Sequence, residues 1–279
     1  MNNNGTPETI WAPYTIRLED FFIRQKFSTH RAVRRLLQNQ MVTVNGERVM
    51  EAGYPLDTRH DILAVNGEQK LISSDLYIMM NKKQNTVCTS DEGLNERIFE
   101  ALPQEFLHPQ GLGALHSVGR LDIDTEGLLI LTTDGKLSHR LTDPTTHIPK
   151  TYLVYLRNAV SEEEQKHYVS LFSKGLWLEA EKKSAAFVTK PAVLHWLDNE
   201  DEYCTIYGAD FTICTLTLTE GKFHQVKRMF KAVGNEVIFL KRIAMGALFL
   251  DASLHPGQWR PLKDEELRCL YSSFNSSMI

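Results

Sequence analysis

The stretch from Gly119 to Gly135, GRLDIDTEGLLILTTDG, constrains the fold of this chain more than any other part of its sequence. A polar, acidic loop opens directly into the apolar run GLLILTT, and a turn closes the stretch at Asp134-Gly135. A short apolar run bounded by turn residues is typical of a buried strand. The stretch therefore predicts carboxylates at the end of a strand, where a rigid scaffold can present them to a substrate.

Three interpretations of this acidic loop are open from its residues alone: a surface turn, a metal-binding loop and an active-site loop. Its spacing copies the first half of an EF-hand at Asp122, Asp124, Glu126 and Gly127. An EF-hand needs a bidentate glutamate at its twelfth position, where this chain has Thr133. Calcium is therefore disfavoured. Metal-dependent hydrolytic or nucleotidyl-transfer chemistry by Asp122 and Asp124 stays as an alternative, and it predicts sensitivity to chelators.

The distribution of charge is more informative than the net charge of −4. Between Phe21 and Gly46 there is no acidic residue, but there are five basic ones: Arg24, Lys26, Arg31, Arg34 and Arg35. A second basic cluster, offset only by Glu220 and Glu236, consists of Lys222, Lys227, Arg228, Lys231, Lys241 and Arg242. Because local patches determine where phosphate binds, a nucleic-acid partner is compatible with this composition.

Cysteine usage and the first residues indicate a cytoplasmic protein. The four cysteines lie far apart without a CxxC pair, which favours reduced thiols and argues against a zinc site. Residues 1–15 lack the basic and apolar regions of a signal peptide, and we expect a disordered extension there. No apolar run approaches the roughly 20 residues that a membrane span needs.

Residues 16–66 predict a small α/β unit. Two short helices are expected at 16–27 and 29–40, with Ser28 as the N-cap of the second. On a helical wheel Ala32, Val33, Leu36 and Leu37 share one face, and the opposite face carries Arg31, Arg34, Arg35 and Gln38. Short β segments follow, and Asn45-Gly46 is a strong hairpin signal. Residues 67–75 are polar and are expected to form a linker.

Residues 76–279 predict a second, larger domain. Strands are expected at 76–81, 127–133, 151–157 and 213–219, and helices at 94–103, 161–175 and 222–234. On the last helix Phe223, Val226, Met229, Phe230 and Val233 form an apolar face, opposite a face of His224, Lys227, Arg228 and Lys231. Because strands and helices do not alternate regularly, we expect an α+β domain around a mostly antiparallel, mixed sheet.

The acidic segment resembles the signature G-R-L-D-x-x-T-x-G-L-x-L-L-T-x-D-G of the pseudouridine synthases, in particular the branch typified by the ribosomal small-subunit enzyme. Other segments resemble further motifs of that family in the expected order: Lys150-Thr151-Tyr152, residues 190–194 (KPAVL), residues 220–230 (EGKFHQVKRMF) and residues 256–262 (PGQWRPL). The first 66 residues resemble an S4 domain, a small RNA-binding module. The resemblance covers nearly the whole chain after residue 15.

This resemblance implies a role for each candidate residue. Asp122 is the expected nucleophile, Lys227 the cation that keeps it ionised, and Tyr152 the aromatic that stacks on the target base and assists proton removal at C5. The expected RNA contacts are Arg120, at the flipped nucleotide, and, at phosphates, Arg228, Lys231, Arg31, Arg34 and Arg35. His116 and Asp124 are interpreted as structural.

The implied reaction needs no cofactor and no metal. Uridine becomes pseudouridine when the N1–C1′ bond breaks, the base rotates and C5 joins C1′, so nothing is added, removed, oxidised or reduced. An ionised nucleophile that forms a transient adduct is sufficient. We expect a cytoplasmic, monomeric isomerase acting on 16S small-subunit ribosomal RNA. The alternatives are a large-subunit RNA substrate and a non-catalytic RNA-binding protein of ribosome assembly.

The chain departs from the family pattern at one segment. The family carries N-K-P-x-G, whereas this chain has Asn81-Lys82-Lys83-Gln84-Asn85. Proline fixes a turn and glycine permits a positive φ. We therefore expect the loop conformation to differ here.

Overall fold

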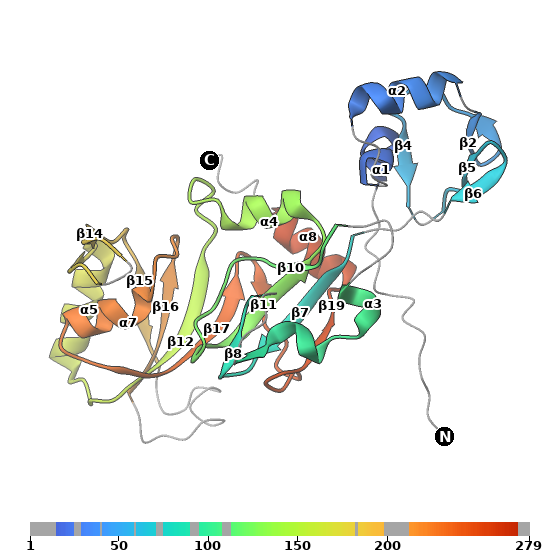
Figure 1. The fold of residues 1–279 in the computed structure, drawn as a ribbon. Coiled ribbons are helices and arrows are strands. Elements are labelled where there is room, and N and C mark those ends of the chain that lie inside the picture. The colour runs from blue at the N-terminus through green and yellow to red at the C-terminus, as the bar shows by residue number, and fades with distance from the viewer. Residues whose placement is uncertain are drawn as a thin grey trace, which may run out of the picture.

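The structure is a computed structural model, and it describes residues 15–24, 29–39, 41–58, 60–70, 75–89, 95–107, 113–181, 184–197 and 212–272. The predicted cap Ser28 and the extension before Thr15 lie outside these ranges. Figure 1 shows a small N-terminal unit set apart from a longer domain built on one large sheet. No helix in the described ranges is long and apolar enough to cross a membrane.

The small unit combines two helices with short strands. Its elements are β1 (Thr15–Arg17), α1 (Leu18–Arg24), α2 (His30–Asn39), β2 (Val42–Val44), β3 (Glu47–Arg48), β4 (Pro55–Asp57), β5 (Leu63–Val65) and β6 (Glu68–Lys70). Four strands form a sheet in the order β3-β2-β5-β6, and β1 pairs with β4. The helix predicted at 16–27 is wrong at its start, because Ile16 pairs with Leu56 in a β ladder.

Two Asn-Gly turns connect neighbouring strands of this sheet, the first between β2 and β3 and the second between β5 and β6. Asn45 and Gly46 have φ values of 52° and 85°, the left-handed conformation of a two-residue hairpin turn. Asn66 and Gly67 repeat it at 52° and 84°. The second turn adds β6 to the sheet, so the small unit extends through Lys70, beyond the boundary at 66 that the sequence predicted.

The two faces of α2 are as predicted. Val33, Leu36 and Leu37 are buried in the core of the small unit. Arg31, Arg34 and Arg35 are exposed on the opposite side. Thr29 precedes the helix as its N-cap, and its hydroxyl accepts a hydrogen bond from the Ala32 amide at 3.1 Å.

The larger domain is built on a nine-stranded sheet in the order β15-β16-β12-β17-β11-β7-β19. Its strands are β7 (Tyr77–Lys82), β10 (His116–Ser117), β11 (Glu126–Thr132), β12 (Lys150–Leu156), β15 (Val193–Trp196), β16 (Thr212–Leu218), β17 (Val237–Met245), β18 (Leu248–Phe249) and β19 (Trp259–Pro261). The short strands β10 and β18 pair with β11 and β17. In the described sheet only the β11–β17 ladder is parallel. This confirms the expected mostly antiparallel, mixed sheet.

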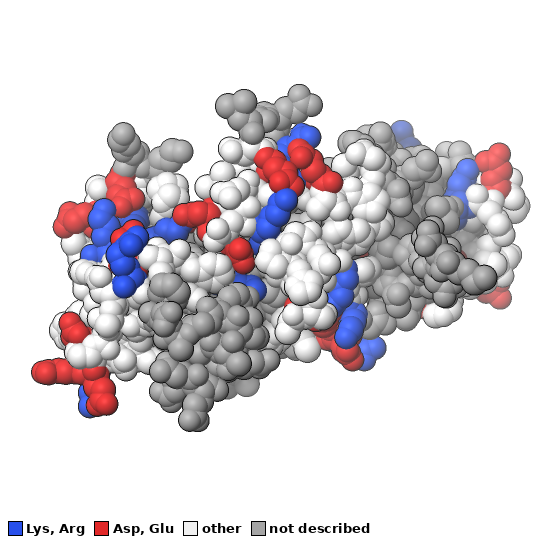
Figure 2. Space-filling model, turned by 90° about the horizontal axis from the view of Figure 1, so that it is seen from below, with Lys and Arg blue, Asp and Glu red and all other residues white. Residues whose placement is uncertain are grey.

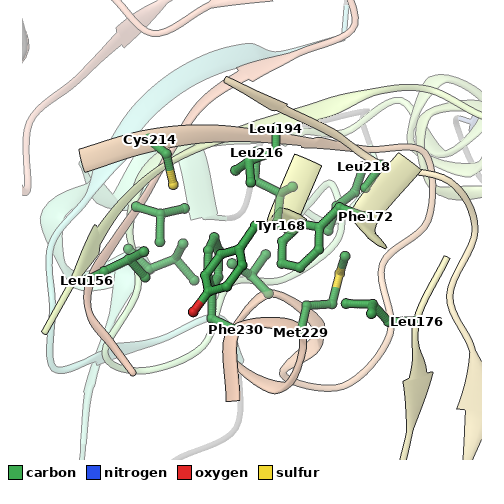
Figure 3. Packing of buried hydrophobic residues seen from close by; sticks show 14 of the residues in the cluster. Leu156, Tyr168, Phe172, Leu176, Leu194, Cys214, Leu216, Leu218, Met229 and Phe230 are labelled. Carbon is green, nitrogen blue, oxygen red and sulfur yellow. The ribbon is translucent and has the colours of Figure 1, made fainter. Parts of the chain in front are cut away.

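Helices cover the sheet at both of its ends. They are η1 (Ile98–Ala101), α3 (Gln104–Leu107), α4 (Gly135–Thr142), α5 (Glu162–Lys174), α7 (Gln225–Ala232) and α8 (Asp264–Ser272). Figure 1 shows α5 and α7 beside β15 and β16, and α4 and α8 near β7 and β11. Under α5 and α7, Phe172, Leu216 and Phe230 pack together in the largest apolar cluster (Figure 3). This packing fixes α7 against the sheet.

The helix predicted at 94–103 is wrong. Glu96–Arg97 instead form strand β9, which pairs in parallel with β8 (Thr86–Val87), and only a 3₁₀ turn follows. Ile98 and Leu102 are buried in the cluster that packs on β7 and β11. Pairing with β8, ten residues earlier in the chain, therefore overrides the local helical pattern.

The last acidic residue of the signature segment is structural. The Asp134 carboxylate accepts hydrogen bonds from the amides of Lys136 (2.9 Å) and Leu137 (3.1 Å), so it caps α4. The same side chain accepts from the hydroxyls of Tyr77 (2.9 Å) and Tyr271 (3.1 Å). Asp134 thereby ties the end of β11 to β7, α4 and α8.

Candidate active site

Three separated segments meet at one cavity. The loop before β11 contributes Asp122, β12 contributes Tyr152 near its start, and α7 contributes Lys227. The cavity has a volume of about 90 Å³. Its lining includes Arg120, Asp122, Thr125, Tyr152, His224 and Lys227. The structure thus brings together the three residues that the sequence singled out as catalytic.

The sheet order accounts for this meeting point. β17 lies between β12 and β11, and its Arg242 is the register partner of both Tyr152 and Gly127. Gly127 has a φ of 105°, and a Cβ there would collide with the Arg242 backbone. Only glycine permits so close an approach. The acidic loop therefore enters β11 two strands across the sheet from Tyr152.

Lys227 connects two carboxylates. Its Nζ lies 3.4 Å from Asp122 Oδ2 and 2.5 Å from Asp124 Oδ1. The side chains of Lys227 and Asp122 are partly buried, 24% and 31% exposed, whereas Asp124 is 59% exposed. Burial raises the pKa of Asp124, but the hydrogen bond and charge of Lys227 outweigh it and lower that pKa. Asp124, which the sequence led us to interpret as structural, is thus the nearer partner of Lys227.

The ammonium group of Lys227 thus lies between Asp122 and Asp124, the two acids whose EF-hand-like spacing suggested a metal-binding loop. Among the described residues, no three His, Cys, Asp or Glu side chains are grouped as metal ligands would be. Among the described residues, Asp122 forms its ion pair with the lysine Lys227.

His224 is a residue that the sequence interpretation left without a role. Its Nε2 lies 3.7 Å from Asp122 Oδ1, on the side of the carboxylate opposite the atom that faces Lys227. The ring also lines the cavity. The only signal in the sequence was its place in the EGKFHQVKRMF segment, and that place does not reveal which way the ring points.

A buried lysine, Lys82, donates hydrogen bonds to the backbone of the acidic loop. Lys82 is 0% exposed, and its Nζ donates to the carbonyls of Ile123 (3.3 Å), Thr125 (3.0 Å) and Lys83 (3.1 Å). Burial lowers its pKa, and the nearby acidic groups oppose that shift. Two of these carbonyls flank Asp124, so Lys82 determines the path of the loop that carries Asp122.

The departure from N-K-P-x-G does not remove the left-handed turn. Asn85, which stands where the family has glycine, has a φ of 63°. Asparagine tolerates this conformation better than most residues. The Asn85 amide donates to the Ile123 carbonyl at 2.8 Å, so this loop packs directly on the acidic loop.

Arg228 does not present its guanidinium to RNA, contrary to our expectation. The residue is 5% exposed, and its two terminal nitrogens donate to Ser184 Oγ (2.9 Å) and the Glu179 carbonyl (2.5 Å). The reason is that strands β13 (Trp177–Leu178) and β14 (Phe187–Val188) pair beside this face of α7, with Phe187 close to the guanidinium. The prediction that Phe223 belongs to the apolar face of this helix is also wrong, since Phe223 precedes the helix and is 37% exposed.

The other expected RNA contacts have accessible side chains. Arg120 is exposed at the cavity, and Lys231 is 80% exposed, 4.0 Å from Glu181. Arg31, Arg34 and Arg35 lie on the small unit. His116, interpreted as structural, is in β10 with its Nδ1 3.0 Å from the Ala114 carbonyl.

Lys150, at the start of β12, predicts a pH-dependent stability. Burial, assisted by the charge of Arg242, lowers its pKa from 10.5 to about 8. Below pH 8 the lysine is charged in both states, and the folded state bears the cost of burying that charge. Between pH 8 and 10.5 the unfolded state binds more protons, so the native protein gains stability as the pH rises.

We therefore expect Lys150→Met to be more stable than the parent near pH 7 by roughly 1–2 kcal/mol, after allowance for partial exposure. This difference should shrink as the pH rises from about 8 to 10.5. Urea unfolding of both proteins across this range measures it. A difference independent of pH would show that burial does not perturb Lys150.

Comparison with known proteins places the chain in a family. A family model described as RNA pseudouridylate synthase matches residues 76–232. The ribosomal small subunit pseudouridine synthase A of Escherichia coli (strain K12) is 39% identical over 249 residues, 89% of this chain and 97% of the relative. Its namesake in Haemophilus influenzae is 37% identical over 255 residues, 91% and 99% of the two chains.

A solved structure, described as the crystal structure of pseudouridylate synthase, matches with a TM-score of 0.58 and 36% identity, over 92% of this chain and 100% of that one. The chain belongs to the RNA pseudouridylate synthase family, whose members are isomerases that act on RNA. The family resemblance noted in the sequence is therefore confirmed.

Proposed function

We propose that this protein converts a uridine of 16S small-subunit ribosomal RNA to pseudouridine, with Asp122 as the nucleophile. The observation that carries the proposal is the meeting of Asp122, Tyr152 and Lys227 around one cavity. The choice of substrate is supported by relatives that are named for the small ribosomal subunit and are matched over nearly their whole length.

The proposed chemistry assigns one task to each of these side chains. Asp122 forms a transient covalent adduct while the N1–C1′ bond breaks and the base turns to join C1′ through C5. C5 loses a proton and N1 gains one, so atoms balance without a co-reactant. Lys227, whose Nζ lies 3.4 Å from Asp122 Oδ2, balances the negative charge of the carboxylate. Tyr152 stacks on the everted uracil and assists removal of the C5 proton.

Eversion of the uridine is the costly step before chemistry. Extruding a base from structured RNA costs a few kcal/mol. Stacking on an aromatic side chain returns about 1–3 kcal/mol per base, which is the contribution we assign to Tyr152. Arg120, exposed at the cavity, is placed to hold the displaced nucleotide or its neighbour.

We further propose that the small unit is an S4-like RNA-binding module and that residues from 76 onward form the catalytic domain. The exposed Arg31, Arg34 and Arg35 form no ion pair with any described residue, which leaves them available for phosphates. Lys231 is the phosphate contact proposed on the catalytic domain. Phosphate contacts position RNA without reading its sequence. We also propose that the protein is a cytoplasmic monomer, since its proposed substrate is ribosomal RNA and the residues of one chain line the site.

Charge across the catalytic domain is mixed rather than uniformly basic. Figure 2 shows groups of lysine and arginine next to groups of aspartate and glutamate on the face seen from below. Attraction to RNA therefore depends on local basic groups. Because such contacts release counterions, binding should weaken as salt increases.

Release of tritium from RNA labelled at uridine C5 tests the proposal, because the C5 hydrogen leaves during isomerisation. We expect release from 16S RNA or a small-subunit assembly intermediate and none from 23S RNA. Added chelator should not change the rate while the RNA stays folded. Release from 23S RNA alone would show that the substrate is large-subunit RNA. No release from any ribosomal RNA would favour a non-catalytic RNA-binding protein.

A further inference from the structure

His224 has a left-handed backbone conformation, which is uncommon for residues other than glycine. Its φ and ψ are 49° and 30°, the left-handed region, immediately before α7 begins. For a residue with a Cβ this conformation costs about 1–2 kcal/mol, whereas glycine adopts it freely. Residues held in such conformations cluster at active sites, where the side chain has a task that offsets the strain.

The strained residue does not serve the fold through its side chain. It stands at the N-cap position of α7, yet its ring makes no capping hydrogen bond. The turn is closed instead by the Gln225 side chain, which accepts from the Lys222 amide at 3.0 Å. The ring is 38% exposed and belongs to no apolar cluster of the described residues. Glycine would therefore serve this backbone position at least as well.

The ring is instead oriented toward the nucleophile. It stacks on Phe223, with ring centroids 3.7 Å apart and planes 18° apart, which limits its rotation. In this orientation Nε2 faces Asp122 Oδ1 at 3.7 Å, while Lys227 faces Oδ2 at 3.4 Å. The two oxygens of one carboxylate thus have different partners.

One partner does not fix a carboxylate. The last torsion of an aspartate is broad, so the group rotates easily about its own axis. The ammonium of a lysine is a compact charge that imposes no plane, and Lys227 is also drawn to Asp124 at 2.5 Å. A second donor on the other oxygen would stop the rotation and aim the attacking oxygen.

We propose that His224 is a positioning residue whose Nε2–H donates to Oδ1 of Asp122 when RNA closes the site. The present 3.7 Å separation must shorten by less than 1 Å, and such contacts are often long before substrate binds. This inference rests on the proposed function, since it assigns a partner to the nucleophile. It requires the tautomer that is protonated at Nε2, or the protonated ring.

Two variants distinguish the loss of the Nε2–H donor of His224 from a change in the backbone conformation at this position. His224→Gly keeps the left-handed turn without a side chain, and His224→Gln supplies an amide NH₂ at a reach similar to Nε2. We expect the glycine variant to keep the parent's thermal midpoint or exceed it and to bind RNA within twofold of the parent. Its single-turnover rate should be about a hundredfold lower, the scale of effect for a misplaced reacting group. The glutamine variant should recover at least a tenth of the parent rate.

The other outcomes overturn the positioning role. They are a glycine variant within threefold of the parent rate, a glutamine variant as slow as the glycine variant, and a loss confined to RNA affinity. Asp122→Asn, tested beside them, separates this inference from the proposed function. If Asp122→Asn is inactive and His224→Gly reacts normally, only the role of His224 is refuted. If Asp122→Asn is active, the proposed function itself fails.

Discussion

Asp122→Asn is expected to lower the single-turnover rate by about 10⁴-fold or more, the scale seen when a covalent nucleophile is removed. The amide has nearly the same shape as the carboxylate but cannot ionise, so it cannot form the covalent adduct. Asp122 lies partly buried in a cavity apart from the proposed phosphate contacts. RNA affinity should therefore stay within about twofold of the parent, because phosphate contacts supply most of it.

Asp124→Asn is the matched control for this prediction. It removes the same charge two residues away, from a carboxylate that is also bound to Lys227. Tritium release should remain measurable in Asp124→Asn and fall below detection in Asp122→Asn. The opposite order would identify Asp124 as the nucleophile. Equal, modest losses in both variants would indicate that neither acid forms an adduct.

Lys227→Met is expected to lower the single-turnover rate by about 10³-fold, the upper end of what one preorganised electrostatic partner contributes. Methionine keeps most of the aliphatic side chain, so the packing of α7 should persist. The variant leaves the Asp122 and Asp124 carboxylates close together without their shared cation. Without the cation the two negative charges repel each other, which displaces the Asp122 carboxylate from its position at the cavity.

Lys231→Met, one helical turn along the same face, is the matched control. Lys231 is 80% exposed, does not line the cavity and lies 4.0 Å from Glu181. Its loss should weaken RNA binding slightly and leave the rate at saturating RNA unchanged. Adding Asp124→Asn to Lys227→Met removes the competing negative charge and should restore part of the rate. No recovery in the double variant would mean that Lys227 acts by something other than its charge.

The sequence predicted the strands that carry the site because each shows a continuous or an alternating apolar pattern. β7, β11, β12 and β16 all begin and end within one residue of their expected bounds. The family motifs also identified Asp122, Tyr152 and Lys227, which the structure brings to one cavity from segments about 30 and 75 residues apart. Hydrophobic patterning and turn chemistry are sufficient for these features because both are local.

Features that depend on distant neighbours were not predictable from the sequence. A helical wheel gives the faces of α7, but not that β13 and β14 cover Arg228. Helix propensity at 94–103 could not foresee that β9 pairs with β8. The family resemblance likewise places Lys227 beside Asp122 without showing that Asp124 is its nearer partner. The direction of the His224 ring depends on a left-handed backbone angle and on stacking against Phe223, and no local sequence pattern reveals either.

The central claim is that the carboxylate of Asp122 isomerises a uridine in small-subunit ribosomal RNA. Mapping of pseudouridine in ribosomal RNA from cells that lack this protein, complemented with either the parent or Asp122→Asn, tests it most directly. One pseudouridine should be missing from 16S RNA in the deletion, return with the parent protein and stay absent with Asp122→Asn. Return of that pseudouridine with Asp122→Asn, or an unchanged 16S map in the deletion, would contradict the claim.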